Sequence, residues 1–272
     1  MRRLFLLLPL CLMMAPDRCP VPLPRSPEHR PPDTASPAAP ARARDRMAYL
    51  AAKDPVAFVE AAIARYDREV KGYTCLLIKQ ERLGGTLMPE EQIQCWFCEE
   101  PSFRVLMEWT QGARLAHRVL YVKGANDDKL LAKLNGVLAL GGTARRDADG
   151  PDARSSARYP ATEFGLRIGM QRTLDAFKAA QARGELRTVF NGLKTVPELG
   201  YPCWELVRPD YPRPEDDGIS HAVYYYDPQT WLQVGSVLRD AQGNLIGRYF
   251  FCEVKINEPI PETMFVEKAL WR

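Results

Sequence analysis

Apolar and polar residues alternate with a period of two over much of the chain downstream of residue 72. The alternation is clear in residues 103–109, where four apolar residues share one face while Arg104 and Glu108 point the other way. Burial of a single face is typical of antiparallel strands, whereas strands of a parallel sheet are apolar on both faces. The pattern predicts an antiparallel sheet with strands over residues 73–83, 91–98, 103–109, 118–123, 129–133, 137–140, 185–196, 203–208, 222–226, 231–239 and 245–256.

Two stretches have the three- and four-residue spacing of an amphipathic helix instead. The first follows Asp54, which is placed to cap a helix, and residues 42–53 add a looser turn or two before it. The second begins at Thr162 and ends near residue 183, after a polar stretch (143–158) that predicts a loop. The expected fold class is α+β: a curled, half-open antiparallel β-sheet, an incomplete barrel of about 8–11 strands, covered by two main helices.

The first fifteen residues predict export. Arg2 and Arg3 precede an apolar run over residues 4–14, which is the arrangement of a secretory signal peptide. This run is about 16 Å long as a helix, roughly half of a ~30 Å hydrocarbon core, so a signal is favoured and a retained anchor stays open. The proline-rich residues 16–41 predict a disordered linker. The expected organisation is a signal peptide (1–15), this linker and a single domain (42–272), located in the periplasm or cell envelope.

Charge and motifs narrow the class of function. The formal net charge is +3, of which residues 1–46 carry +4, so the remainder of the chain carries −1 and nucleic-acid binding is not expected. Motifs for a nucleophilic serine, a zinc protease, a phosphate loop or a dinucleotide site do not occur, and the three histidines are His29, His117 and His221. The sequence predicts a non-enzymatic protein with no cofactor and no metal, with an exported hydrolase as the weakest alternative.

Seven cysteines are present, and five of them fall in the predicted domain. Cys95 and Cys98 lie within one predicted strand, where residues three apart point to opposite faces, so redox or zinc function is not expected of the pair. A hairpin centred between Thr86 and Leu87 would pair residues whose numbers sum to 173, which sets Cys75 opposite Cys98. Export permits disulfides. The pattern therefore predicts a cross-strand disulfide between Cys75 and Cys98.

The apolar face of the predicted sheet is the remaining signal. An ordinary packed core explains it, but a long sheet that curls over a helix either fills its interior or encloses a ligand cavity. The hypothesis is a cavity for an apolar ligand, such as a lipid or a lipoprotein acyl chain. Its candidate lining residues are Leu76, Ile78, Phe97, Phe103, Val105, Met107, Trp109, Leu174, Phe177, Trp204, Leu232, Val234 and Phe250.

Several segments resemble those of exported proteins. The order helix, strands, helix, strands, together with residues 223–234, 240–244 and 257–265, is similar to the exported lipoprotein-carrier superfamily that includes LolA, LolB, LppX and RseB. This resemblance implies a half-open barrel lidded by helices, with a lipid-accepting interior and no defined catalytic residue. The RseB likeness leaves open an alternative, a structural or sensory envelope protein with a filled barrel and a protein partner.

A second resemblance is more specific. Residues 73–85, 101–109 and 159–165 are similar to a domain-of-unknown-function family of exported bacterial proteins, and this likeness extends over residues 54–265. The chain departs from the carriers in its proline-rich segment and in residues 143–158, which argues against direct exchange of a ligand with a partner protein.

Overall fold

The computed structural model describes residues 38–209 and 218–272. The predicted signal peptide and most of the predicted linker lie outside the described residues. The first helix, α1 (Ala38–Lys53), begins within the range assigned to the linker and replaces the looser turns expected over residues 42–53. Residues 38–272 form one compact unit. In the described part of the chain, helices are too short or too polar to cross a membrane.

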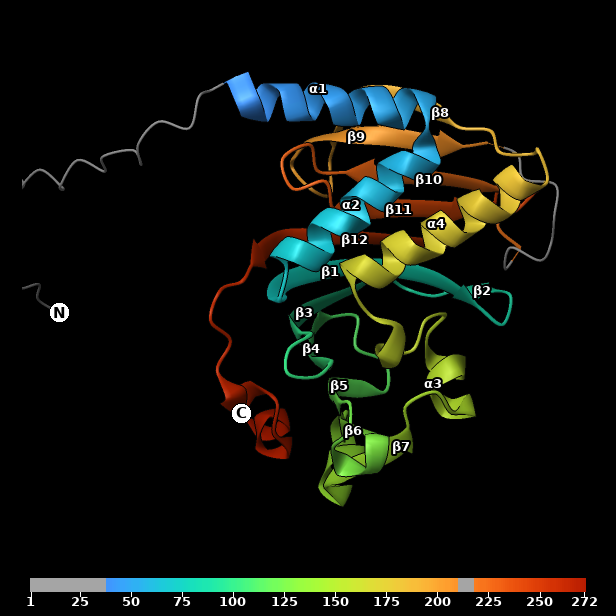
Figure 1. Ribbon diagram of the computed structural model, residues 1–272. Coiled ribbons are helices and arrows are strands. Elements are labelled where there is room, and N and C mark those ends of the chain that lie inside the picture. The colour runs from blue at the N-terminus through green and yellow to red at the C-terminus, as the bar shows by residue number, and fades with distance from the viewer. Residues whose placement is uncertain (1–37, 210–217) are drawn as a thin grey trace, which may run out of the picture. The chain divides into compact units, whose positions relative to one another are not determined.

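An antiparallel sheet of twelve strands dominates the fold (Figure 1). Its order is β7-β6-β5-β4-β3-β1-β12-β11-β10-β9-β8, with β2 paired to β1, and its edge strands β7 and β8 do not pair with each other. The predicted curled, half-open antiparallel sheet is thus confirmed. The strands are β1 (Gly72–Leu83), β2 (Thr86–Leu87), β3 (Glu91–Cys98), β4 (Arg104–Gln111), β5 (Ala116–Val122), β6 (Lys129–Leu134), β7 (Thr143–Asp147), β8 (Val189–Val196), β9 (Tyr201–Arg208), β10 (His221–Tyr226), β11 (Gln233–Arg239) and β12 (Leu245–Ile256).

Two helices lie across one face of the sheet, α2 (Pro55–Glu69) and α4 (Leu166–Ala182) (Figure 1). Asp54 caps α2 as expected, since its side chain accepts a hydrogen bond of 3.0 Å from the backbone N–H of Ala57. The remaining α-helix of the described residues, α3 (Pro151–Ser156), is short. The 3₁₀ helices are η1 (Asn126–Asp128), η2 (Gly136–Gly141), η3 (Ala161–Glu163), η4 (Glu262–Met264) and η5 (Glu267–Trp271).

Both faces of the sheet are partly buried. On the inner face, Phe58 of α2 packs edge-on against Tyr226, with ring centroids 4.7 Å apart. On the outer face of β4–β6, Leu106 and Leu120 are covered by Phe265 near the C-terminus. The expectation that the outer face meets solvent is therefore wrong for β4, and Arg104 is buried there in an ion pair with Glu262.

Two local predictions between residues 137 and 158 are wrong. Residues 137–140, expected as a strand, belong to η2, which begins at Gly136 (φ 57°) and is followed by Gly142 (φ 79°), and both glycines turn the chain. The polar stretch 143–158 contains β7 and α3 rather than a loop. An edge strand such as β7 tolerates polar side chains because one of its sides has no neighbouring strand.

The register of β1 and β3 overturns the predicted disulfide. Cys75 lies opposite Cys95, and Cys98 lies opposite Gly72, so the pairing is offset by three residues from the expected one. An odd offset exchanges the two faces. Cys75 and Cys95 are buried on the inner face, whereas Cys98 is half-buried on the outer face, and all three are free cysteines. The Cys75–Cys98 prediction is wrong, while the expectation that Cys95 and Cys98 point to opposite faces is confirmed.

Candidate functional site

A cavity of about 990 Å³ opens on the inner face of the sheet. It lies among the inner residues of β1 and β3–β7, the segment from α3 to α4, and parts of β10–β12. Ligand pockets in proteins span about 300–1,000 Å³, so this cavity is at the upper end of that range. Its position is where a lidded half-barrel would hold a ligand.

Small and aliphatic side chains line much of the cavity. Ala132 of β6 pairs with Val119 of β5 on one side and with Ala144 of β7 on the other, and all three side chains line the cavity. Met107 and Trp109 of β4 extend the same wall. Alanine leaves space where a large inner residue would have filled it, so the strands themselves create the hollow.

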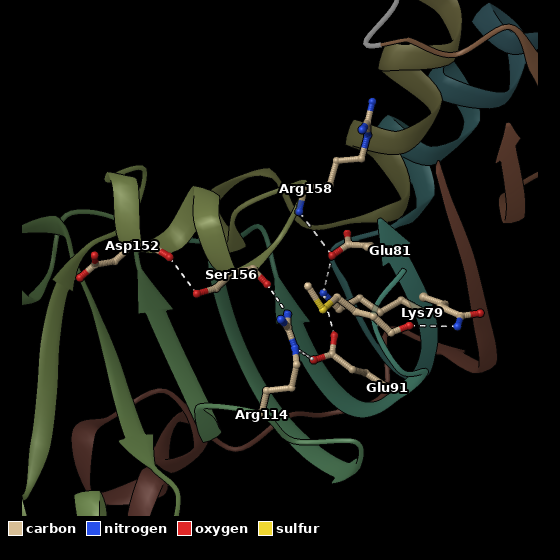
Figure 2. Close-up of polar contacts among 9 residues, drawn as sticks. Lys79, Glu81, Glu91, Arg114, Asp152, Ser156 and Arg158 are labelled. Atoms are coloured by element: carbon tan, nitrogen blue, oxygen red, sulfur yellow. Dashed lines mark hydrogen bonds and ion pairs between the residues drawn. The ribbon is translucent and has the colours of Figure 1, made fainter. Parts of the chain in front are cut away.

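Three charged side chains form a buried group on the cavity wall, which we call the Lys79 cluster (Lys79, Glu81 and Glu91). Lys79 Nζ lies 3.0 Å from Glu81 Oε2 and 3.0 Å from Glu91 Oε2 (Figure 2). The exposed fractions are 8%, 4% and 6%, respectively. Alternation along β1 turns Lys79 and Glu81 to the inner face, and the register places Glu91 of β3 directly opposite Lys79.

The Lys79 cluster is tied to the segment that follows α3. Glu81 accepts hydrogen bonds from the backbone N–H of Arg158 (3.3 Å) and from the hydroxyl of Tyr249 (2.8 Å). Glu91 pairs with Arg114 at 3.3 Å, and the Arg114 guanidinium also donates to the carbonyl oxygen of Ser156. Figure 2 shows Arg114 between Glu91 and Ser156. These contacts hold residues 156–158 against the sheet.

Neighbouring charges keep Lys79 protonated, and burial keeps the phenol of the adjacent Tyr249 neutral. Burial acts to lower the pKa of Lys79, but the neighbouring Glu81 and Glu91 carboxylates outweigh it, and the pKa lies above its ordinary value. Burial, aided by the charge of Glu81, raises the pKa of Tyr249 well above its ordinary value. With two cations (Lys79, Arg114) and two anions, the polar wall is neutral overall and its carboxylates are already occupied by donors.

The structure places the thirteen residues predicted to line one cavity in several different environments. Of the thirteen candidates, Met107 and Trp109 line the large cavity, and Leu232 and Val234 line a different hollow of about 450 Å³. Leu76 and Ile78 are only partly buried, on the face of β1 opposite Leu77, and Phe250 of β12 pairs with Ile78. The others contribute to the packed core, namely Phe97, Phe103, Val105, Leu174, Phe177 and Trp204.

Sequence reasoning missed the Lys79 cluster and the alanines. The wrong hairpin register placed Leu76 and Ile78 inside, and therefore placed Lys79 and Glu81 outside. Correct phasing of β1 would have shown two charged residues following Cys75 and Leu77 on an otherwise apolar inner face. Among residues 38–209 and 218–272, His, Cys, Asp and Glu side chains do not gather into a group that could hold a metal ion.

Residues 70–269 match the family model "Protein of unknown function (DUF1571)", so the chain belongs to this family. The predicted membership of a family of unknown function is thereby confirmed. Curated protein sequences do not match the chain.

Several solved structures match the chain at low similarity. MucB is 15% identical over 78% of this chain and 62% of the MucB chain, with a TM-score of 0.46. LppX of Mycobacterium tuberculosis is 11% identical over 77% of this chain and 99% of its own, with a TM-score of 0.38. A LolA superfamily protein of Nitrosomonas europaea is 8% identical over 78% and 99%, with a TM-score of 0.34. At these values, the function must be argued from the geometry of this chain.

Proposed function

We propose that this protein is a non-enzymatic binding protein of the cell envelope, which holds a lipid or a lipoprotein acyl chain inside its half-barrel. The observation that carries the proposal is the cavity of about 990 Å³, lined by aliphatic and aromatic side chains on a sheet that the helices cover only in part. Predominantly apolar lining with a few placed polar groups is typical of sites for small amphipathic molecules.

The energetics favour a ligand with a long apolar chain. Burial of each methylene contributes about 0.8 kcal/mol, so a chain of ~14 methylenes would contribute roughly 11 kcal/mol before the costs of association. Those costs are several kcal/mol. At the lower bound of about 4 kcal/mol for those costs, roughly 7 kcal/mol remains, which corresponds to a Kd on the order of 10 µM without a strong polar contact.

The Lys79 cluster supports a neutral polar group at the end of that chain. Its charges cancel once the Arg114 guanidinium is counted with it, and Glu81, Glu91 and Arg114 all line the cavity. A free carboxylate would meet two like charges and two cations that are already paired with them, whereas a hydroxyl, ester or amide could accept a hydrogen bond from Arg114, whose side chain is 32% exposed. An acylglycerol or an ester-linked lipid therefore fits better than a free fatty acid.

A filled barrel that acts only through a protein partner is the weaker alternative. That alternative requires large side chains on the inner face of β5–β7, where the chain instead has Ala116, Ala132 and Ala144. The sheet is filled over β9–β12, where aromatic residues pack under α2 and α4.

Filling the cavity provides the test. Ala144→Trp and Ala116→Trp each place an indole in the hollow, and Ala64→Trp on the exposed side of α2 is the matched control. The two cavity variants should bind a fluorescent monoacylglycerol at least tenfold more weakly than the wild type, with unchanged cooperative unfolding, and the control should bind normally. Native mass spectrometry of protein purified from its own envelope should show a bound lipid mass. Absence of probe binding by the wild type, together with a bare protein mass, would refute the proposal.

A further inference from the structure

Three large apolar side chains are exposed together at the tip that joins β6 and β7. Val137 is 81% exposed, Leu138 54% and Leu140 88%, all within η2. Leu115, 54% exposed, adjoins them, because its carbonyl oxygen accepts a hydrogen bond of 3.0 Å from the backbone N–H of Asn135, one residue before η2. Exposed apolar residues that occur singly need no explanation, but a contiguous group on a soluble domain marks an interaction surface.

This apolar tip (Leu115, Val137, Leu138 and Leu140) lies at the mouth of the cavity. Leu115 and Leu138 line the cavity while more than half of each side chain is exposed. Leu115 and Leu138 therefore connect the cavity with the exposed side chains of Val137 and Leu140.

Basic residues surround the apolar tip. Residues 130–146 include Lys133, Arg145 and Arg146 and contain no Asp or Glu. Arg145 and Arg146 form exposed ion pairs with Glu267 (2.8 Å) and Asp152 (3.3 Å), respectively, contacts of the kind that contribute little in water.

A tryptophan borders the same end of the sheet. The indole of Trp271 is 44% exposed and donates a hydrogen bond of 3.1 Å to the Thr143 hydroxyl, and Lys133 Nζ lies 5.2 Å from its ring centroid. Tryptophan beside lysine is the combination favoured at the boundary between lipid headgroups and water. Figure 1 shows β6 and β7 at the end of the described domain opposite α1, away from α2 and α4.

We propose that the apolar tip docks onto an anionic lipid surface, inserting Val137, Leu138 and Leu140 below the headgroups while Lys133 and Arg145 face the lipid phosphates. Apolar insertion and attraction of basic residues to anionic lipids add to each other in peripheral binding. A protein groove or a second copy of the chain would need complementary apolar and acidic surfaces, whereas an anionic bilayer supplies both at once. This inference goes beyond the proposed function, since a protein can bind a lipid in solution without docking to a membrane.

Sedimentation with vesicles tests the docking surface. The protein purified from its own envelope should sediment with vesicles of phosphatidylglycerol and phosphatidylcholine in equal parts, and much less with phosphatidylcholine alone. The double variant Val137→Asp/Leu140→Asp should lose at least about tenfold in vesicle affinity, since two inserted side chains are replaced by charges. The matched control is Val189→Asp/Leu193→Asp, which changes two residues, each 49% exposed, on the edge strand β8.

Binding of fluorescent monoacylglycerol in the absence of vesicles separates this inference from the proposed function. The Val137→Asp/Leu140→Asp variant should retain it, so loss of vesicle binding alone supports docking. The inference is overturned if the wild type does not sediment with anionic vesicles, or if the two double variants sediment with these vesicles to the same extent. It is also overturned if the wild type is a dimer that the Val137→Asp/Leu140→Asp change dissociates, because the surface then serves a second copy.

Discussion

Replacing Lys79 by methionine should destabilise this protein far more than an ordinary lysine substitution. The change keeps the length of the side chain but removes the cation between Glu81 and Glu91, which are 4% and 6% exposed. Breaking a buried ion pair from one side costs about 3–5 kcal/mol, because the remaining charge is left in a poorly solvated site. For a domain of this size each kcal/mol lowers Tm by about 2–4 °C, so the expected loss is roughly 6–20 °C.

The measurements are thermal unfolding, which gives Tm, and urea unfolding, which gives the free energy of unfolding, both followed by near-ultraviolet circular dichroism with Lys178→Met as the control. Lys178 pairs with Glu60 at 2.7 Å, but both side chains are about half exposed, so this change should cost less than ~1 kcal/mol. The triple variant Lys79→Met/Glu81→Gln/Glu91→Gln should be more stable than Lys79→Met, because it removes the two buried charges that Lys79 balanced. Equal stability losses in Lys79→Met and Lys178→Met would refute the reasoning.

The same cluster predicts a dependence on alkaline pH. Because the folded-state pKa of Lys79 is raised, its stabilising contribution is complete below the unfolded pKa of about 10.4 and is lost as pH rises through the folded pKa. The stabilities of the wild type and Lys79→Met should therefore converge only above about pH 10.4. Convergence at neutral pH would contradict the assignment of charge to this lysine.

Two further outcomes are expected. Tyr73→Phe should lower the free energy of unfolding by about 1–3 kcal/mol. The reason is that the buried Tyr73 hydroxyl accepts a 3.0 Å hydrogen bond from the N–H of Leu166 at the start of α4. The control Tyr49→Phe, at an exposed position, should not change the free energy of unfolding measurably. In the native protein at pH 8, a maleimide should label half-buried Cys98 well before the buried Cys203 and Cys252. Burial raises the pKa of Cys203 to about 12 and that of Cys252 to about 11, which keeps both thiols protonated at this pH. Equal labelling rates for the three thiols would contradict the prediction and would show that the outer face opens readily.

Periodicity predicted the strands well because burial of the inner face is a local property of each strand. The β3 and β12 ranges agree with the structure at both ends, and the Asp54 cap defines the start of α2. Edge elements were less predictable. β7 is polar and η2 is apolar, because neither packs into the core that produces the usual pattern.

Register was the step that local pattern could not settle. The prediction assumed a tight turn centred between Thr86 and Leu87, whereas these two residues form β2, which pairs back onto Arg82 and Leu83. Residues 88–90 then lead into β3. The offset of three residues turned the side chains of β1 to the other face, while Phe97 of β3 stayed inside as predicted, so an error about one turn concealed Lys79 and Glu81 on the cavity wall.

Large apolar residues were also the wrong feature from which to predict a ligand site. Large side chains such as Phe58 and Tyr226 fill the space beneath α2, and they identify the packed half of the sheet. The hollow half is recognised by what is small: Ala132 and Ala144 on neighbouring strands, beneath an α3 of six residues instead of the fifteen of α2. The concave face of a curled sheet is either filled by side chains or encloses a cavity. Here the short helix above it and the alanines at inner positions together leave a cavity. Alanine at inner positions of consecutive strands, together with an inner-facing lysine on β1 of the same sheet, is therefore the sequence pattern from which this cavity could have been inferred.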